Sequence, residues 1–194
     1  MKNIAILFFS LYSLTSYSQE IKTDSLYTLP VPANWGVERF PIPIGFAPQI
    51  PYKGVEDIRF TPGWAKAACD EYWSYAFLWY LDGGIKIDVK TIENNLKLYY
   101  TGLITANGST ISTPIETSFK EITKEGNDLK TYLGTISLLD YMAKQPMVLT
   151  CKVHIASCTD KTKTFIFYEL SPKPLSHIIW QSLDALWADF KYKK

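Results

Sequence analysis

The sequence predicts an α+β fold in which two principal helices pack on a mainly antiparallel sheet. Only two segments carry apolar residues at helical spacing, whereas several others alternate as strands do. These strands follow one another in a group instead of alternating with helices, and this order favours antiparallel pairing over a parallel sheet. The chain of 194 residues is long enough for one ordinary domain.

The first 18 residues have the pattern of a cleavable signal peptide. Lys2 provides a positive charge, and Ile4–Leu14 is an apolar run too short to span a bilayer. Small residues, Ser16 and Ser18, then precede a cleavage point. We therefore expect a periplasmic or secreted protein. The alternative interpretation of this segment is a buried N-terminal helix or strand.

Cleavage before Gln19 leaves residues 19–194, which we expect to form a single α+β domain. Loss of Lys2 leaves 19 basic and 19 acidic side chains, so the net charge is near zero. A chain without a basic surplus is not expected to bind nucleic acid or an anionic membrane. No later segment is long and apolar enough to predict a membrane span.

The first half of the domain is irregular until an aromatic strand. Residues 35–63 are rich in proline and glycine, which prevents long helices but allows short extended pieces such as Val55–Phe60. Glu71–Leu81 is rich in aromatic residues and is followed by Asp82-Gly83-Gly84, a turn signal. This pattern predicts a strand over 71–81.

One face of the predicted aromatic strand carries four large rings, at Trp73, Tyr75, Phe77 and Trp79. We interpret these rings as part of the core, because two amphipathic helices need an apolar surface to pack on. The alternative is an exposed platform on which sugars or other planar ligands stack.

The first predicted helix covers Asp88–Ala106. Its apolar residues recur at helical spacing and form one stripe. Asp88 is a suitable N-cap residue, and Asn107-Gly108 is a suitable C-terminal stop. We therefore expect this helix to lie with its stripe against the sheet.

A run of strands follows the first helix, at Thr117–Thr123, Leu129–Leu138, Met147–Cys158 and Thr164–Leu170. The last two are predicted to form a hairpin in which Lys152 lies opposite Glu169. Its apolar face then pairs Val153 with Tyr168 and Ile155 with Ile166. A slip of one residue would destroy both the charged and the apolar pairs, so the pattern indicates this register.

The last predicted helix covers residues 177–192, after the stiff connector Ser171-Pro172-Lys173-Pro174. Ser176 is its expected N-cap residue, and His177 falls in its first turn. The closing lysines, Lys191, Lys193 and Lys194, are interpreted as a cationic last turn that complements the helix dipole.

Three phrases resemble an uncharacterised family of exported proteins from Gram-negative bacteria: FPIPIGFAPQI, GVEDIRFTPGW and EYWSYAFLWYLDG. The order of the elements and the size of the chain are also similar to those of PsbP-like proteins. That second resemblance implies a sandwich of an antiparallel sheet with helices on its faces. Neither resemblance implies an activity or a functional residue.

No catalytic, cofactor or metal motif is present. The sequence lacks G-x-S-x-G, H-E-x-x-H, the Walker loop and G-x-G-x-x-G. It has only two histidines, and we interpret His154 as a partly exposed strand residue on the same face as Lys152. We predict no catalytic residue, no cofactor and no metal.

Three cysteines remain after cleavage, at Cys69, Cys151 and Cys158. If Cys151 and Cys158 lie in one strand, their side chains are too far apart for a disulfide. Cys69 can pair with either of them, or all three can be reduced. The carboxylates of Asp70 and Glu71 beside Cys69 disfavour a nucleophilic thiolate.

The candidate ligand-binding residues are Trp35, Trp64, Asp57 and Glu71. The two tryptophans lie in the irregular region, where side chains are less obliged to be buried. The two acids belong to the pairs Glu56-Asp57 and Asp70-Glu71, and in an extended chain the members of each pair point to opposite faces. The simpler interpretation of these acids is that they flank strands and solvate their ends.

These observations lead to two hypotheses of function. The first is a non-enzymatic exported module that binds an unidentified partner or supports an envelope assembly, with a glycan or an envelope protein as the candidate partners. The second is a carboxylate-dependent hydrolase of an envelope or extracellular polymer, with Asp57 or Glu71 near a cleft lined by Trp64. A deep pocket with two nearby carboxyl groups would favour the hydrolase.

Overall fold

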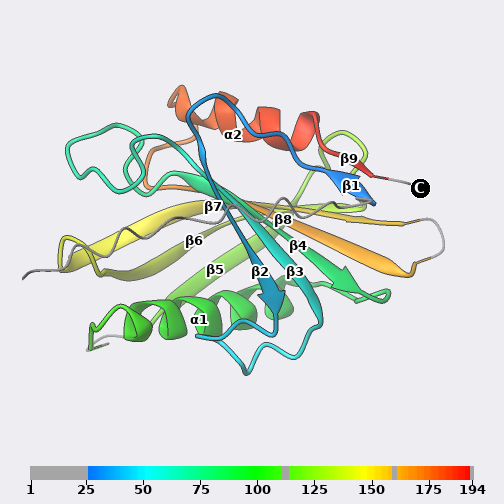
Figure 1. The fold of residues 1–194 in the computed structure, drawn as a ribbon, viewed down its shortest axis with the longest axis horizontal. Helices are drawn as coiled ribbons and strands as arrows, with labels where there is room; N and C mark the ends of the chain where they lie inside the picture. Colours follow the sequence, from blue (N-terminus) through cyan, green and yellow to red (C-terminus); the bar gives the residue numbers. More distant parts are fainter. Residues whose placement is uncertain (1–25, 111–113, 159–160, 193–194) are drawn as a thin grey trace, which may run out of the picture.

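The structure is a computed structural model that describes residues 26–110, 114–158 and 161–192. The predicted signal peptide, residues 1–18, lies outside the described residues. Within them, the chain forms an α+β fold with one helix on each side of a central sheet, as predicted (Figure 1). No helix in this part of the chain has the length and apolar character that a membrane crossing requires.

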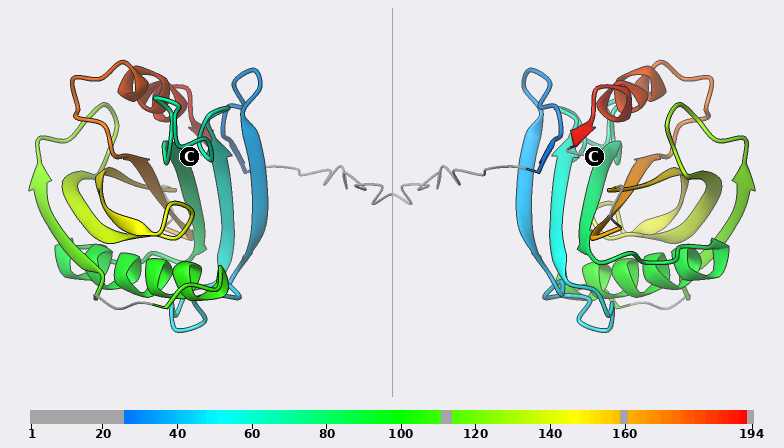
Figure 2. Two further views of the ribbon diagram at one scale, coloured as in Figure 1. Left: turned by 90° about the vertical axis from the view of Figure 1, so that its left-hand side faces the viewer. Right: turned by 90° about the vertical axis from the view of Figure 1, so that its right-hand side faces the viewer.

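The described residues form a seven-stranded antiparallel sheet in the order β2-β3-β4-β8-β7-β6-β5. A separate two-stranded ribbon pairs β1 with β9, so the two ends of the described chain meet beside α2 (Figures 1 and 2). The bounds are Tyr27–Thr28 for β1, Gly36–Ile42 for β2, Gly54–Phe60 for β3, Tyr75–Asp82 for β4, Val89–Ala106 for α1, Glu116–Ile122 for β5, Lys130–Asp140 for β6, Gln145–Ser157 for β7, Lys163–Ser171 for β8, Ile179–Ala188 for α2 and Lys191–Tyr192 for β9.

The hairpin of β7 and β8 has the predicted register. Lys152 pairs with Glu169, and the apolar pairs are Val153 with Tyr168 and Ile155 with Ile166. The predicted strand over Val55–Phe60 is also present, as β3. Alternation along the strands could therefore place side chains on faces correctly wherever the strand itself was recognised.

The aromatic strand begins later than predicted. The prediction began at Glu71, but β4 begins at Tyr75, and residues 71–74 belong to a turn. Trp73 has a φ of 54°, a left-handed conformation that interrupts an extended chain. Its backbone N–H donates to the carbonyl oxygen of Trp64 at 2.8 Å, which closes the turn.

The first helix agrees with the prediction. Asp88 caps α1 by accepting a hydrogen bond from the backbone N–H of Thr91, and Asn107 is the C-cap residue. Gly108 has a φ of 72°, the left-handed conformation that favours glycine after a helix. The helix therefore covers its predicted length and packs on the sheet at β5 and β6.

The second helix is shorter than predicted. It covers Ile179–Ala188 instead of 177–192, and Ser176 does not cap it. His177 supplies a local contact instead, since its Nδ1 accepts from the backbone N–H of Ile179 at 3.2 Å. Lys191 lies in β9, not in a last helical turn, because pairing with β1 competes with the helix. Lys193 and Lys194 lie outside the described residues.

The two faces of the sheet carry separate cores. On the α1 side, the four large rings of the predicted aromatic face are buried, which confirms the core interpretation: Trp73 from the turn before β4, and Tyr75, Phe77 and Trp79 from β4. The other side packs against α2 and the β1–β9 ribbon through a smaller cluster that includes Phe165, Phe167 and Leu183. The sheet is therefore apolar on both sides, and polar groups within it need partners.

Candidate functional site

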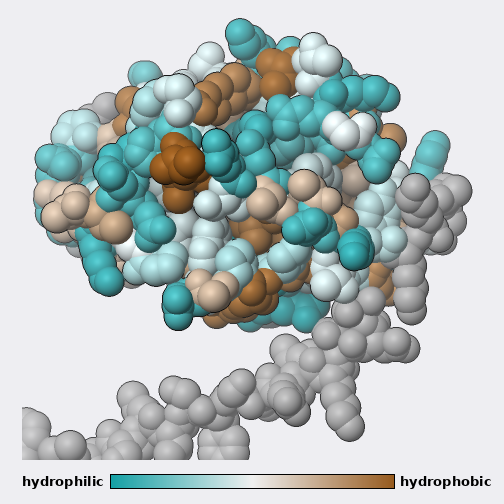
Figure 3. Space-filling model, turned by 90° about the horizontal axis from the view of Figure 1, so that it is seen from above, coloured by the Kyte–Doolittle hydropathy of each residue, from teal (hydrophilic) through white to brown (hydrophobic). Residues whose placement is uncertain are grey.

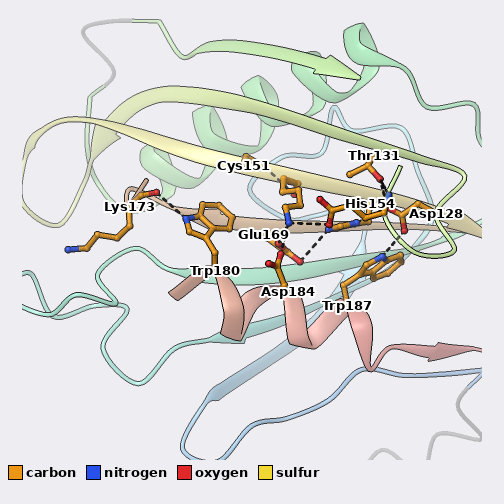
Figure 4. Close-up of polar contacts among 11 residues, drawn as sticks. Asp128, Thr131, Cys151, His154, Glu169, Lys173, Trp180, Asp184 and Trp187 are labelled. Carbon is orange, nitrogen blue, oxygen red and sulfur yellow. Dashed lines mark hydrogen bonds and ion pairs between the residues drawn. The ribbon is translucent and has the colours of Figure 1, made fainter. Parts of the chain in front are cut away.

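A cluster of charged side chains lies between the sheet and α2. We call it the charge cluster and define it by five residues: Asp128, Lys152, His154, Glu169 and Asp184 (Figure 4). They come from the turn before β6, from β7, from β8 and from α2. Alternation along β7 turns Lys152 and His154 to the same side, and the hairpin register brings Glu169 opposite Lys152.

His154 is at the centre of this cluster and is only 1% exposed. Its Nδ1 lies 2.7 Å from Oδ2 of Asp128, and its Nε2 lies 3.3 Å from Oε1 of Glu169. Burial alone would lower the pKa of His154, but the hydrogen bond with Asp128 and the interaction with Glu169 outweigh it and raise the pKa to about 9. The imidazole is therefore a cation at neutral pH. The prediction of a partly exposed histidine was wrong, because α2 covers this side of the hairpin.

Lys152 links the interior of the cluster to its edge. Its Nζ lies 2.5 Å from Oδ1 of Asp184, 3.2 Å from Oε2 of Glu125 and 3.9 Å from Oε2 of Glu169. Burial lowers the pKa of Lys152, whereas the surrounding carboxylates raise it, and the net shift is upward. The ammonium group is thus a fixed charge that holds one oxygen of each rim carboxylate.

Asp128 receives hydrogen bonds from three directions. In addition to His154, the hydroxyl of Thr131 donates to Oδ2 at 2.5 Å and Nε1 of Trp187 donates to Oδ1 at 2.7 Å. Figure 4 shows Asp128 and Trp187 meeting beside His154. Because Trp187 lies on α2, this carboxylate ties the helix to the turn before β6.

Glu169 is completely buried, and neither carboxylate oxygen has a well-aligned hydrogen bond within the described residues. Burial raises the pKa of Glu169 to about 7, although the neighbouring His154 and Lys152 pull it down. Its compensation comes from the hydrogen bond and charge of His154 and, at longer range, from the ammonium group of Lys152. A buried acid of this kind is costly unless the cations stay in place.

A pocket of about 360 Å³ opens beside the charge cluster. We call it the acidic pocket, and its rim contains the carboxylates of Glu125, Asp128 and Asp184. Aromatic rings from the end of the chain form an apolar wall, at Trp187, Phe190 and Tyr192. On the surrounding α2 face, hydrophilic and hydrophobic residues are interspersed (Figure 3).

The chemistry available in the acidic pocket is mainly that of hydrogen-bond acceptors. The side chains of Glu125 and Asp184 are 45% and 46% exposed, and Lys152 holds only one oxygen of each. His154, charged at neutral pH and buried between two acids, has no lone pair to act as a base. Among the described residues, no group of histidine, cysteine and acidic side chains has the arrangement of a metal site.

The predicted site residues are brought together only in part. Asp57 is buried on the α2 side of β3, where it pairs with Arg59 and accepts a hydrogen bond from the hydroxyl of Tyr27. Arg59 also donates to the carbonyl oxygens of Leu29 and Pro30. Asp57 therefore anchors the N-terminal segment, and the interpretation that it solvates the end of a strand was wrong.

Of the other three predicted residues, Trp35 lies apart, whereas Glu71 and Trp64 share the segment before β4. Trp35 is partly buried against the α2-side core, and Glu71 accepts a hydrogen bond from the backbone N–H of Gly63 at 2.6 Å. Trp64 lines a second pocket, on the α1 side of the sheet. Asp57 and Trp64 are thus on opposite faces of the sheet, so Asp57 does not join a cleft lined by Trp64. Glu71 does lie near Trp64, but one of its carboxylate oxygens is held by the N–H of Gly63.

The charge cluster was missed at the level of sequence, although one signal pointed to it. The register of the β7–β8 hairpin placed Lys152 opposite Glu169 and His154 on the same face. Asp128 and Asp184 gave no signal, because the turn before β6 and α2 meet this face only in the folded chain. Comparison of the chain with protein-family models, curated proteins and solved structures found no match. Function must accordingly be inferred from the site itself.

Proposed function

We propose that the protein is an exported, non-enzymatic module that binds a saccharide of the cell envelope in the acidic pocket. Export rests on the pattern of residues 1–18, in which a positive residue, an apolar run and small residues follow in order. The binding role rests on the pocket. The main observation in support of binding is the pair of half-exposed carboxylates, Glu125 and Asp184, that Lys152 holds at the rim of the pocket.

The acceptors of this rim match the hydroxyl groups of a sugar. The second oxygen of each carboxylate has no partner within the described residues and is therefore available to accept from a ligand rich in hydrogen-bond donors. Hydrogen bonds from hydroxyls to carboxylates are charge-assisted and therefore strong. Phe190 and Tyr192 add an apolar wall, and ring-lined sites commonly receive the apolar face of a ligand.

Pre-organisation supports the same role. Lys152 contacts the rim carboxylates of Glu125 and Asp184 and also lies within ion-pair distance of the buried Glu169. These contacts hold the rim in place, so it needs little reordering when a ligand binds. A rigid site loses less conformational entropy on binding than a mobile one. The defined binding geometry then offsets the free-energy cost of burying these charged side chains.

The contacts of the carboxylates favour binding over hydrolysis. A glycosidase needs one carboxylic acid that can donate a proton and one free carboxylate. Here Asp128 is saturated by its three donors, Asp184 and Glu125 share Lys152, and Glu169 is sealed from the pocket by burial. We therefore expect no release of reducing ends when the protein is incubated with envelope polysaccharide.

Calorimetric titration with chito-oligosaccharides and soluble peptidoglycan fragments tests the proposal. We expect saturable binding, and we expect Asp184→Asn to weaken it by about 10-fold, because the amide keeps an acceptor but loses the charge. The matched control is Asp189→Asn, since Asp189 is exposed at the end of the same helix and does not line the pocket. Equal weakening by both variants, or no binding of either ligand class, would contradict the proposal.

A further inference from the structure

A second pocket lies on the opposite side of the sheet from the charge cluster. It has a volume of about 230 Å³ and is bounded by β2, β3, α1, the start of β4 with the segment before it, and the turn after β6. Most of its lining side chains are aromatic, so we call it the aromatic pocket. Partly buried rings surround its mouth, at Phe40, Phe60, Trp64 and Tyr141, and buried rings form its floor, at Tyr75 and Tyr99. The volume suits a small chemical group, since drug-sized ligands commonly occupy larger pockets.

The charged residue of this pocket is Glu38. Alternation along β2 turns its side chain to the α1 side, where it lies beside Ile58 of β3 and on the same face as Phe40. Its carboxylate is exposed, and among the described residues it has neither an ion-pair partner nor a hydrogen-bond donor. Within this part of the chain, no lysine, arginine or histidine lines the pocket. The negative charge of Glu38 is therefore not compensated by a cation of the described chain.

The charge of Glu38 acts on the rings of the aromatic pocket. Burial is the largest cause of the raised pKa values of Tyr99 and Tyr141, and the negative charge of Glu38 is a smaller contribution to both. The face of an aromatic ring is itself the negative pole of a quadrupole. The ring faces and the carboxylate together attract a positive charge and repel an anion.

The cations of the protein do not use the rings of this pocket. Within the described residues, the rings that receive a cation on their face are those of Tyr27, Tyr80 and Tyr132. None of these three residues lines the aromatic pocket. The ring faces of the pocket are thus available to a cation from outside.

The pocket offers few hydrogen-bond acceptors, and this selects the kind of cation. The hydroxyl of Tyr99 donates to Glu56, and the hydroxyls of Tyr75 and Tyr100 are hydrogen-bonded to each other. Metal ions and simple ammonium groups hold water firmly, so entry into such a lining would cost them hydrogen bonds. A quaternary ammonium group has no N–H donor to satisfy, and aromatic cages are the usual surroundings in which proteins bind one.

We propose that the aromatic pocket binds a small organic cation through its quaternary ammonium group. The rings surround the alkyl groups of the cation, and the carboxylate of Glu38 balances its charge at the mouth. This site is independent of saccharide binding, because the acidic pocket lies on the other face of the sheet. Failure of one proposal therefore leaves the other standing.

Three probes test the proposal by titration calorimetry with the full exported chain. Choline carries a trimethylammonium group, its carbon analogue has an uncharged tert-butyl group in the same place, and ethanolamine keeps the charge without the methyl groups. We expect choline to bind about 5- to 30-fold more tightly than the carbon analogue, because only choline is attracted by the ring faces as a cation. Ethanolamine is expected to bind more weakly than choline, since its ammonium group is strongly hydrated.

The indole signals of two tryptophans locate the cation, because each pocket contains its own tryptophan. Trp64 lines the aromatic pocket, whereas Trp187 lines the acidic pocket, whose carboxylates also attract cations. In ¹H–¹⁵N NMR spectra, choline should shift the indole signal of Trp64 and leave that of Trp187 in place.

The variant Glu38→Gln tests the carboxylate, because the amide has a similar shape without the charge. It should weaken the binding of choline by about 5-fold and leave that of the carbon analogue unchanged. The matched control is Glu116→Gln. Glu116 is exposed on β5, the opposite edge strand, has no ion-pair partner among the described residues and does not line the aromatic pocket. This variant changes the net charge equally and should leave choline binding unaltered.

Four results would overturn the proposal. They are equal affinity for choline and its carbon analogue, no binding of choline, a shift of the Trp187 signal alone, and equal weakening of choline binding by the two variants. The first three are measured on the unaltered chain, so they need no variant to fold.

Discussion

Each face of the central sheet buries a glutamate, and the two are compensated in different ways. Glu56 points to the α1 side, where Oε1 accepts from the hydroxyl of Tyr99 at 2.7 Å and Oε2 accepts from Nε1 of Trp79 at 3.0 Å. Glu169 points to the α2 side, where His154 and Lys152 lie within ion-pair distance. Both side chains are completely buried.

The difference shows two solutions to the same problem. Among the described residues, no cation lies within ion-pair distance of Glu56, and burial raises its pKa to about 8 despite the two hydrogen bonds. That carboxyl group is therefore mostly protonated at neutral pH and keeps the α1 side free of charge. On the α2 side, His154 and Lys152 oppose the effect of burial, so the pKa of Glu169 rises only to about 7, and Lys152 also holds the rim of the acidic pocket. A buried acid held by neutral donors stabilises packing, whereas one beside cations can organise a polar site.

The largest expected effect concerns the α1 side. Trp79→Ala should lower the free energy of unfolding by about 4 to 5 kcal/mol, because it leaves a cavity in the aromatic core and removes a donor to Glu56. Urea unfolding followed by circular dichroism measures the change. A loss below about 1 kcal/mol would show that the ring is not part of a packed core.

A somewhat smaller loss is expected on the α2 side. His154→Leu should cost about 3 kcal/mol, because it leaves Asp128 and Glu169 buried without the cation between them. The same variant combined with Glu169→Gln should recover part of the loss, since the amide carries no charge. If the double variant were no more stable than the single one, charge compensation would not be the reason for the cluster.

A further expected effect is a dependence of stability on pH that both faces share in sign. The pKa of Glu56 rises from 4.5 to about 8 on folding, so its contribution is complete below about pH 4.5 and is lost as the pH rises through 8. The pKa of His154 rises from 6.5 to about 9, so its contribution is complete below about pH 6.5 and is lost as the pH rises through 9. The pKa of Glu169 is also raised, from 4.5 to about 7, and acts in the same direction. The free energy of unfolding should therefore fall between about pH 4.5 and pH 9.

Glu56→Gln separates the two faces in this experiment. Its stability curve should fall less steeply than that of the unaltered protein between about pH 5 and pH 8, because one titrating group is gone. The decline of the free energy of unfolding toward about pH 9 should persist, because it arises from the titration of His154. A variant whose curve is parallel to that of the unaltered protein would mean that Glu56 does not change its protonation on folding.

Local patterns in the sequence were sufficient for most elements but not for their ends. The caps of α1 were recognised because Asp88 and Asn107-Gly108 act within one turn of the helix. The start of β4 was misplaced because the turn at Trp73 depends on a hydrogen bond to Trp64, nine residues earlier. The end of α2 was misplaced because β9 pairs with a strand at the other end of the chain. Strand and helix interiors follow local spacing, whereas ends respond to distant partners.

The sequence by itself determined the fold class, the faces of the strands that were recognised, and the register that sets Lys152 against Glu169, because alternation and helical spacing are local properties of the chain. Only the tertiary structure decided that His154 is buried between Asp128 and Glu169 and that Glu56 meets Tyr99 and Trp79. These contacts join β3, β4, α1, β7, β8 and the turn before β6. The order in which those elements pack is a property of the whole folded chain, and the two pockets exist only as its consequence.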